Sequence, residues 1–295
     1  MAHHITMSFL PDCMTQVEIV PGYPVLEINH PEATARIALH GGHMMDWTPA
    51  GEEPVLYMSP DAVIEPGKPI RGGIPICWPW FGPHPTDAEK PAHGFVRTQM
   101  WTLDEVASTT DHIEVALGLR SSDATRAIWP HEFALQLRVS VGAQLEVALI
   151  IRNPGTSAWT MTGALHTYFC VADVSQAVIR GLHGTQFIEG RLSPEKRLQT
   201  GLVRIDQEVD RVYLSDAAVE VEDIGGKRTL VIEKAGSRST VVWNPWIEKS
   251  KRLSDLPDND YPRFLCIETT NAGEDSVTLQ PGAEHRLTTR LRVRH

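Results

Sequence analysis

The amino-acid sequence predicts an all-β protein, a sandwich or a barrel, and three observations support this prediction. Apolar and polar residues alternate along many short segments, which is the pattern of strands with one buried face. Turn-forming pairs such as Pro21-Gly22, Gly225-Gly226 and Pro281-Gly282 separate these segments. Segments with a helical period are few. Many short strands joined by turns, with almost no helices, are typical of sandwiches and barrels.

The expected elements follow from this pattern in chain order. The alternating segments, each expected to form a strand, are residues 16–20, 25–29, 33–39, 111–119, 133–141, 145–153, 158–171, 219–223, 228–233, 239–243, 264–269 and 286–293. The best candidates for short helices are residues 60–63 and 122–128. No repeat, low-complexity tract or linker divides the chain, so we expect one domain over residues 1–295. Residues 1–15, which begin MAHHITM, are expected to be disordered or a cloning remnant.

The charge balance and the cysteines limit the classes of partner and compartment. The 27 Lys and Arg residues against 37 Asp and Glu give a formal net charge of −10, which argues against nucleic acid or an acidic membrane as partner. No apolar run is long enough to span a bilayer, and none near the N-terminus resembles a secretion signal. The four cysteines show no CxxC spacing, and a disulfide framework is not expected in a chain of this size. We therefore expect a cytoplasmic protein and a monomer.

Residues 70–101 combine cationic side chains with large aromatic ones. A core strand has no use for guanidinium groups, and a solvent-exposed loop has no use for so many aromatic rings. Arginine offers forked donors to a phosphate or carboxylate, aromatic faces can stack on a sugar ring, and glycine lets backbone approach a ligand. The segment therefore predicts a concave site for an anionic ligand, although a proline-rich loop with solvated arginines is the alternative. Its relevant residues are Arg71, Gly72, Gly73, Trp78, Trp80, Phe81, His84, His93, Phe95 and Arg97.

Two further ionisable residues stand on apolar segments. His166 is the one ionisable residue in the middle of residues 158–171, and Glu268 ends the apolar segment at residues 264–269. An ionisable group on a buried strand must be paired or remain neutral. Two such groups suggest compensation across a cleft, where general acid–base chemistry is found. The alternative is a satisfied core histidine and an ordinary strand-end glutamate.

Several motifs, read together, resemble the D-hexose-6-phosphate mutarotase family, the glucose-6-phosphate 1-epimerase branch of the aldose 1-epimerase superfamily. The motifs run in the family's order from about Gly41 to the C-terminus, and the first and fifth are specific to the branch. They are IRGGIPICWPWFG, HGFVRTQMW, GALHTYF, EVDRVY, NPWIEKSKRLSDLPDNDYPRFLCIETTNA and LQPGAEHRL. The resemblance implies a large antiparallel β-supersandwich of the galactose mutarotase type with its sugar site on a concave face.

The resemblance also implies roles for individual residues. The family's acid corresponds to His166 and its base to Glu268. Its substrate-binding residues correspond to Arg71, His93, Arg97 and Asp210, with Asp206 and Glu208 as neighbours that leave the last position open. One departure is Ala92, where family members often have Gln. The implied reaction is exchange of the α and β anomers of a hexose 6-phosphate by ring opening and closure, without a metal or organic cofactor.

Other interpretations remain open at this point. A non-catalytic sugar-phosphate sensor would show the same arginines and aromatics, and an aldose 1-epimerase acting on free sugars would show the same acid and base. His166, Cys170, Cys266 and Glu268 could bind zinc, or a cysteine could act as nucleophile beside His166. The acidic turn at residues 255–260 could hold calcium, but a solvated turn is the expectation. His40 and His43 are expected to flank a strand-end turn and not to form a ligand pair.

Overall fold

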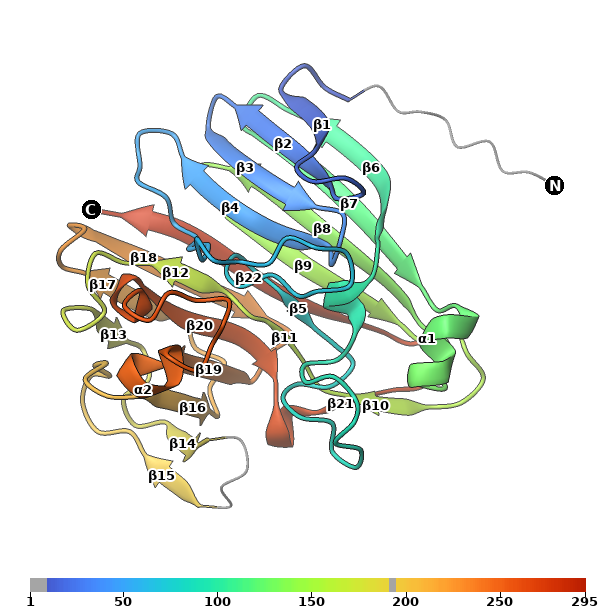
Figure 1. Ribbon diagram of the computed structural model, residues 1–295. Coiled ribbons are helices and arrows are strands. Elements are labelled where there is room, and N and C mark those ends of the chain that lie inside the picture. Colours follow the sequence, from blue (N-terminus) through green and yellow to red (C-terminus); the bar gives the residue numbers. More distant parts are fainter. Residues whose placement is uncertain (1–9, 191–194) are drawn as a thin grey trace.

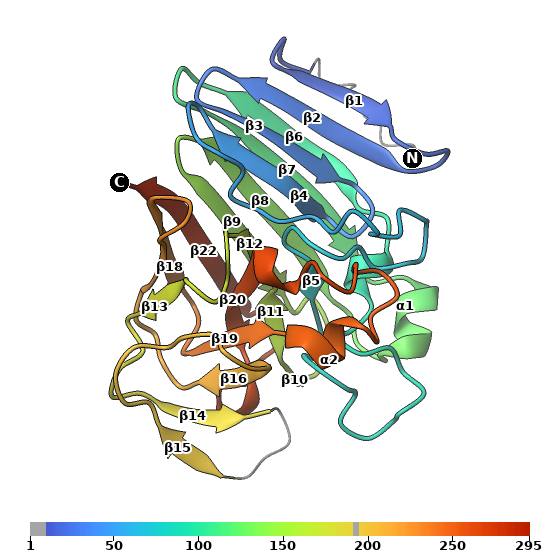
Figure 2. The same ribbon diagram turned by 60° about the vertical axis from the view of Figure 1, so that its left-hand side comes forward.

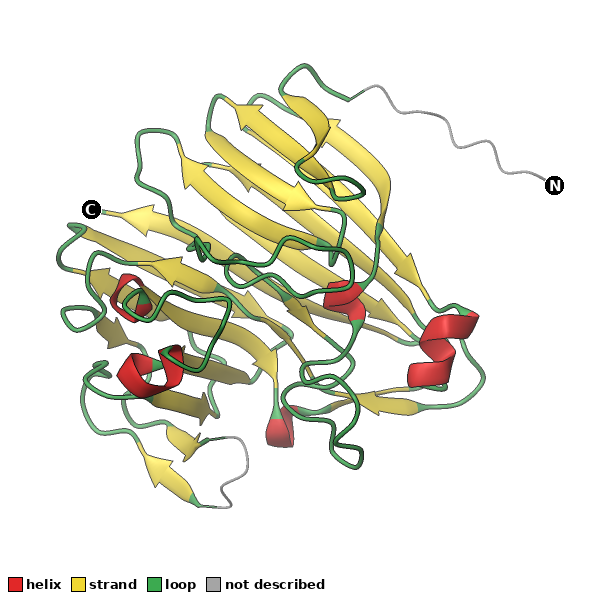
Figure 3. Cartoon of the chain, viewed as in Figure 1, coloured by secondary structure: helices red, strands yellow, loops and turns green. Residues whose placement is uncertain are grey.

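Antiparallel strands make up most of the protein, with a few short helices between them (Figures 1 and 3). This computed structural model describes residues 10–190 and 195–295. The strands are β1 (Met14–Glu18), β2 (Pro24–His30), β3 (Ala33–Ala38), β4 (His43–Pro49), β5 (Ile76–Cys77), β6 (Thr102–Ser108), β7 (His112–Arg120), β8 (Ala134–Gly142), β9 (Leu145–Arg152), β10 (Trp159–Met161), β11 (Gly163–Leu165), β12 (Tyr168–Cys170), β13 (Val178–Arg180), β14 (Gln186–Glu189), β15 (Lys196–Leu198), β16 (Val209–Tyr213), β17 (Val219–Asp223), β18 (Arg228–Ala235), β19 (Ser239–Asn244), β20 (Phe264–Asn271), β21 (Val277–Leu279) and β22 (Glu284–Arg294). The helices are α1 (Asp123–Ile128), α2 (Trp246–Ser250) and the 3-10 turns η1 (Val96–Thr98), η2 (Tyr261–Arg263) and η3 (Gly273–Asp275).

The strands form the two layers of a sandwich. One layer is an eight-stranded sheet in the order β13-β17-β18-β22-β9-β8-β7-β6. Two sheets pack over it: β1–β4 lie over its β6–β9 side, and β15-β14-β16-β19-β20-β11-β5 lie over the rest, with β12 paired to β20 (Figure 2). A β10-β21 ribbon completes the described topology. The all-β sandwich predicted from the alternating segments is therefore confirmed.

Strand β20 separates two apolar clusters, and this arrangement places the site. Leu265 and Ile267 point into the main core between the layers. Phe264 and Cys266 point to the other face, into a smaller cluster that includes Tyr168 and Trp243. Successive side chains of a strand alternate between faces, so Glu268 shares the face of the smaller cluster. All eight residues of β20 are buried because both of its faces are covered.

Two of the expected elements are wrong, and α1 is correct. Residues 60–63 form no helix: Ser59 Oγ accepts from the Asp61 amide and closes a single turn instead. Residues 158–171 are three short strands, because the Thr167 amide bonds the Leu165 carbonyl and the ladder breaks at His166. Helix α1 begins after Ser122, which forms a reciprocal cap with Thr125.

The N-terminal expectation falls mostly outside the described residues. Residues 1–9 lie outside them, whereas Met14 and Thr15 belong to β1 and pair with β2. None of the helices in residues 10–190 and 195–295 has the length and apolar character that crossing a bilayer requires.

Candidate active site

His166 and Glu268 meet on the outer face of β20. The His166 amide donates to the carbonyl of Pro75 (3.0 Å), the residue before β5, and His166 lies outside the neighbouring strands. Its Nε2 lies 3.4 Å from Glu268 Oε1, and the two side chains are 8% and 0% exposed. An imidazole and a carboxylate at this distance can share or exchange a proton. The structure thus brings together the two ionisable groups that the sequence placed on separate apolar segments.

Aromatic rings surround the His166 imidazole on several sides. Tyr168 stacks on it with a centroid distance of 4.8 Å and an interplanar angle of 8°. Trp243 meets it edge-on at 6.1 Å, and His93 meets it at 5.7 Å. Phe81 packs in turn on His93 at 5.1 Å. The imidazole is therefore fixed in orientation by ring contacts, and His93 is beside the acid–base pair as predicted.

Arg71 lies at one edge of this cluster and is held by two partners. Its Nε and Nη2 donate to Asp255 Oδ1 at 3.1 and 2.9 Å, and its Nη1 donates to Tyr168 Oη at 3.1 Å. The Arg71 side chain remains 20% exposed. Burial opposes its charge, but Tyr168 and Asp255 together raise the pKa of the guanidinium, so it stays cationic. Arg71 is thus a fixed positive charge with donors left for an anion.

The residues after Arg71 pack against protein backbone. A Cβ on Gly72 would lie 2.5 Å from the Tyr57 carbonyl, and one on Gly73 would lie 2.2 Å from the Met44 carbonyl. Both glycines have positive φ. The expectation that they let backbone approach a ligand is therefore not what the structure shows. They let the Arg71 segment pass between β4 and residues 57–58.

Arg97 and His93 lie on the second part of the same segment. Arg97 Nη2 donates to the Ala92 carbonyl at 2.8 Å, and its side chain is half-buried. His93 has φ +65°, a conformation that is uncommon outside glycine and often found at functional sites. The next residue, Gly94, packs closely against the backbone of Trp78, because a Cβ at Gly94 would lie 1.9 Å from the Trp78 carbonyl. Tight packing of the segment thus places the Arg97 guanidinium next to the backbone that carries His93.

Asp210 closes the opposite side of the cluster. The registers of β16, β19, β20 and β12 align Asp210 with Trp243, Cys266 and Tyr168 in one row across the sheet. Lys249 of α2 lies over the Trp243 ring, 2.8 Å from Glu208 Oε1 and 3.9 Å from Asp210 Oδ2. Asp210 is therefore on the His166–Glu268 face, whereas Glu208 is already committed to Lys249.

The thiol and metal alternatives lose their geometric basis. Burial raises the pKa of the Cys266 thiol well above its usual range, and the charge of Glu268 adds to the effect. Burial likewise raises the pKa of Cys170. In the described part of the chain, no three His, Cys, Asp or Glu side chains are grouped so as to hold a metal ion. In the turn at residues 255–260, Asp258 and Asn259 are exposed, whereas Asp255 binds Arg71 and Asp260 accepts from the Tyr57 hydroxyl.

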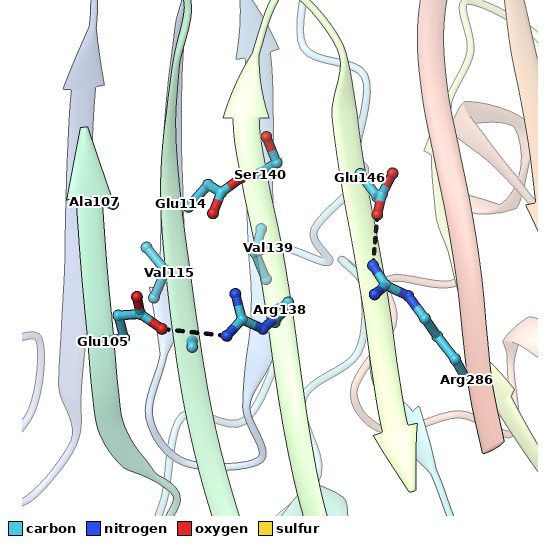
Figure 4. Close-up of a pocket in the computed structure, with 10 residues that line it drawn as sticks. Glu105, Ala107, Glu114, Val115, Arg138, Val139, Ser140, Glu146 and Arg286 are labelled. Carbon is cyan, nitrogen blue, oxygen red and sulfur yellow. Dashed lines mark hydrogen bonds and ion pairs between the residues drawn. The ribbon is translucent and has the colours of Figure 1, made fainter. Parts of the chain in front are cut away.

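Two hollows lie away from this cluster. One, of about 250 Å³, lies on the outer face of β6–β9 and β22, where Glu105 pairs with Arg138 and Glu146 with Arg286 (Figure 4). The other, of about 540 Å³, includes Lys234. The Lys234 ammonium donates to several backbone and hydroxyl oxygens. The Glu105–Arg138 and Glu146–Arg286 pairs and the Lys234 ammonium are thus used in protein contacts, whereas the His166–Glu268 cluster combines an ionisable pair with a partly exposed cation and is the candidate active site.

Comparison with known proteins shows the family of this chain. The family model for aldose 1-epimerase matches residues 24–292. The chain belongs to the aldose 1-epimerase family. A proposed glucose-6-phosphate 1-epimerase of Escherichia coli (strain K12) is 35% identical over 264 residues, covering 88% of this chain and 87% of the relative.

Solved structures of this family share the fold. The crystal structure of YeaD, a proposed mutarotase from Salmonella typhimurium, has a TM-score of 0.90 at 31% identity and covers 97% of this chain and 95% of its own. A galactose mutarotase-like protein from Clostridium acetobutylicum, at 14% identity, has a TM-score of 0.75, covers 96% and 98% of the two chains, and shows the fold alone. The galactose mutarotase type of supersandwich expected from the motifs is confirmed.

Three residues of this candidate site were missed in the sequence. Tyr168 stands two positions after His166, a spacing that could have indicated a neighbouring ring. Trp243 carries no local signal, because its place beside His166 depends on strand pairing. Asp255 was considered only as a calcium ligand or a solvated residue, yet it is the carboxylate that holds Arg71.

Proposed function

We propose that this protein interconverts the α and β anomers of a hexose 6-phosphate, with glucose 6-phosphate as the preferred substrate. The observation that carries the proposal is the buried His166–Glu268 pair with a fixed cation, Arg71, linked to it through Tyr168. The E. coli relative and the YeaD structure support the same class of reaction.

The reaction needs an acid and a base side by side. The C1 hydroxyl of a pyranose must lose its proton while the ring oxygen gains one, and both oxygens are bonded to C1. Glu268 takes the proton from O1 and protonated His166 gives one to O5, after which the C1–O5 bond opens. Rotation about C1–C2 and closure on the other carbonyl face give the other anomer, with the two residues exchanging roles. Each proton transfer contributes about 10²–10⁴-fold.

The remaining residues of the site bind the sugar phosphate. Arg71 and Arg97 hold the 6-phosphate through charge-assisted hydrogen bonds. His93 and Asp210, on opposite sides of the pair, hold ring hydroxyls. A metal-independent mechanism, a monomeric state and a cytoplasmic location remain predictions, the last in keeping with four free cysteines.

The test is anomer exchange of glucose 6-phosphate and of free glucose, followed side by side by NMR exchange spectroscopy. We expect a higher kcat/KM for the phosphate ester. Arg97→Ala should raise KM for glucose 6-phosphate about ten- to hundredfold, because one charge-assisted contact is lost, and should affect free glucose less. Equal rates on both sugars, with equal effects of Arg97→Ala, would instead indicate an epimerase of free sugars. Binding of the phosphate ester without exchange would indicate a sensor.

A further inference from the structure

We propose that Tyr168 is a positioning residue that joins phosphate binding to proton transfer: its hydroxyl orients Arg71, and its ring orients His166. This inference rests on the proposed function, because it explains how the phosphate-binding Arg71 and the proton-transferring His166 of that site are held in fixed relative positions. Tyr168 contacts both parts, and its side chain is almost fully buried.

The hydroxyl side of Tyr168 fixes the guanidinium. Three of the five N–H donors of Arg71 are directed into the protein, two toward Asp255 and one toward Tyr168 Oη. Since these contacts involve Nε and both terminal nitrogens of the planar group, they fix its orientation and leave two N–H donors for a ligand. Burial raises the pKa of the Tyr168 phenol, so the ring carries no charge that would compete with the substrate phosphate for Arg71.

The ring side of Tyr168 fixes the imidazole. The 8° angle and 4.8 Å separation make a nearly parallel stack, and Trp243 closes the edge at 79°. A flat stack on one side and an edge contact on another restrict rotation of the His166 ring. Rotation would move Nε2 away from Glu268 Oε1, which lies 3.4 Å from it. Tyr168 therefore supports the geometry on which proton transfer depends.

The hydroxyl of Tyr168 contacts Arg71 and its ring contacts His166, so different substitutions can remove the two contacts separately. Tyr168→Phe keeps the ring and removes the hydroxyl: KM for glucose 6-phosphate should rise about three- to tenfold with kcat little changed, and free glucose should be unaffected. Tyr168→Leu removes the stack as well, so kcat should fall for both sugars. In an Arg71→Ala background, Tyr168→Phe should add nothing to KM, because the hydroxyl acts through Arg71.

The matched control is Tyr57→Phe, which removes the hydroxyl of another buried tyrosine in the same apolar cluster. The Tyr57 hydroxyl donates to Asp260 and not to Arg71, and the Tyr57 ring stacks on Phe264, so removing this hydroxyl should leave KM unchanged. Thermal midpoints of all variants separate folding from function, and Tyr168→Phe alone carries the test if Tyr168→Leu does not fold.

Each outcome decides the inference. The KM increase confined to the phosphate ester, absent in the Arg71→Ala background, supports it. In Tyr168→Phe, an unchanged KM for glucose 6-phosphate, or an equal loss of kcat on both sugars, overturns the inference while the proposed function stands; so does a kcat in folded Tyr168→Leu that equals that of the wild type. A wild-type protein that exchanges no hexose 6-phosphate anomers overturns the proposed function itself.

Discussion

Glu268 is a carboxylate on a strand that is covered on both faces, and this position shows how the site works at the residue scale. A buried carboxylate without compensation is strongly unfavourable. His166 supplies a proton partner at 3.4 Å, and the surrounding rings exclude water. A low-dielectric environment strengthens any interaction that develops between such groups and a reacting sugar. The same burial that makes the pair costly to fold would strengthen the proposed action of the pair as an acid and a base.

Removing either member of the pair should therefore remove catalysis. His166→Asn and Glu268→Gln each keep side-chain size and take away proton transfer, so we expect kcat to fall about 10²–10⁴-fold, as measured by NMR exchange on glucose 6-phosphate. Circular dichroism should show an unchanged fold. The control is Cys266→Ala on the same strand face, which should keep most activity because its thiol remains protonated. Activity near wild type in either pair variant, or its loss in Cys266→Ala, would contradict this assignment.

At the scale of elements, the Arg71 segment depends on β4 for its position. His43, at the start of β4, is fully buried, and its Nε2 donates to the Gly72 carbonyl at 3.0 Å. His40 is also partnered, because the Gly67 amide donates to its Nε2. The glycines between Arg71 and β5 leave room for this contact. One neutral histidine thus anchors the backbone that presents the cation of the site.

This anchor predicts a pH dependence of stability. Burial, together with the nearby charges of His40 and Arg97, lowers the pKa of His43 from 6.5 to about 3, although its bond to Gly72 opposes the shift. Between these values the unfolded state binds a proton that the folded state does not. The free energy of unfolding should therefore fall on acidification below pH 6.5, by up to ~1.4 kcal/mol per pH unit from this residue. Urea unfolding of the wild type and of His43→Gln, from pH 7 to 4.5, measures the slope. His43→Gln keeps a donor but does not titrate, so its slope should be shallower; parallel slopes would refute the assignment.

Some strands could be predicted from the sequence and others could not, and the difference has physical reasons. Strands β7, β8 and β22 have one face in the core, so alternation revealed them. Strand β4 is buried along most of its length and alternates only over residues 45–49, which is too short a stretch to stand out. The break at His166 is caused by bonds to Pro75 and Gly73, which are distant in sequence and leave no local pattern.

The same distinction applies to the candidate site. His166 and Glu268 were predictable because each is an ionisable residue on an apolar strand. The contacts that orient them come from Trp243 and from the Arg71–Asp255 pair, which only the pairing of sheets brings together. The sequence therefore indicated the two ionisable groups, the family resemblance gave them their proposed roles, and the fold supplied the contacts that hold them in place.

At the scale of the whole molecule, Arg228 joins the two layers behind the site. It pairs with Asp223 at 3.3 Å, and both side chains are at most 5% exposed. Its Nη1 donates to the Glu53 carbonyl, and its Nη2 donates to the Pro54 and Cys170 carbonyls. Cys170 ends β12, which carries Tyr168, whereas Arg228 begins β18 of the opposite layer. The guanidinium thus links β18 of one layer to backbone carbonyls of β12 and of the segment after β4 in the other layer.

Loss of this tie should destabilise the fold more than it affects the chemistry. Arg228→Met leaves Asp223 buried without its partner, so we expect the free energy of unfolding to fall by roughly 3–5 kcal/mol in urea titrations. The control is the double variant Asp223→Asn/Arg228→Met, in which the uncompensated charge is gone. Asn keeps an acceptor for the Ala172 and Gly226 amides, so the double variant should recover part of the loss. Because Arg228 lies behind β12 and touches neither His166 nor Arg71, kcat of the folded fraction should change little. If Arg228→Met is as stable as the wild type, the Asp223–Arg228 pair adds no net stability. If the double variant is no more stable than Arg228→Met, the contacts of Arg228 with the carbonyls, and not the charge pair, hold the layers together.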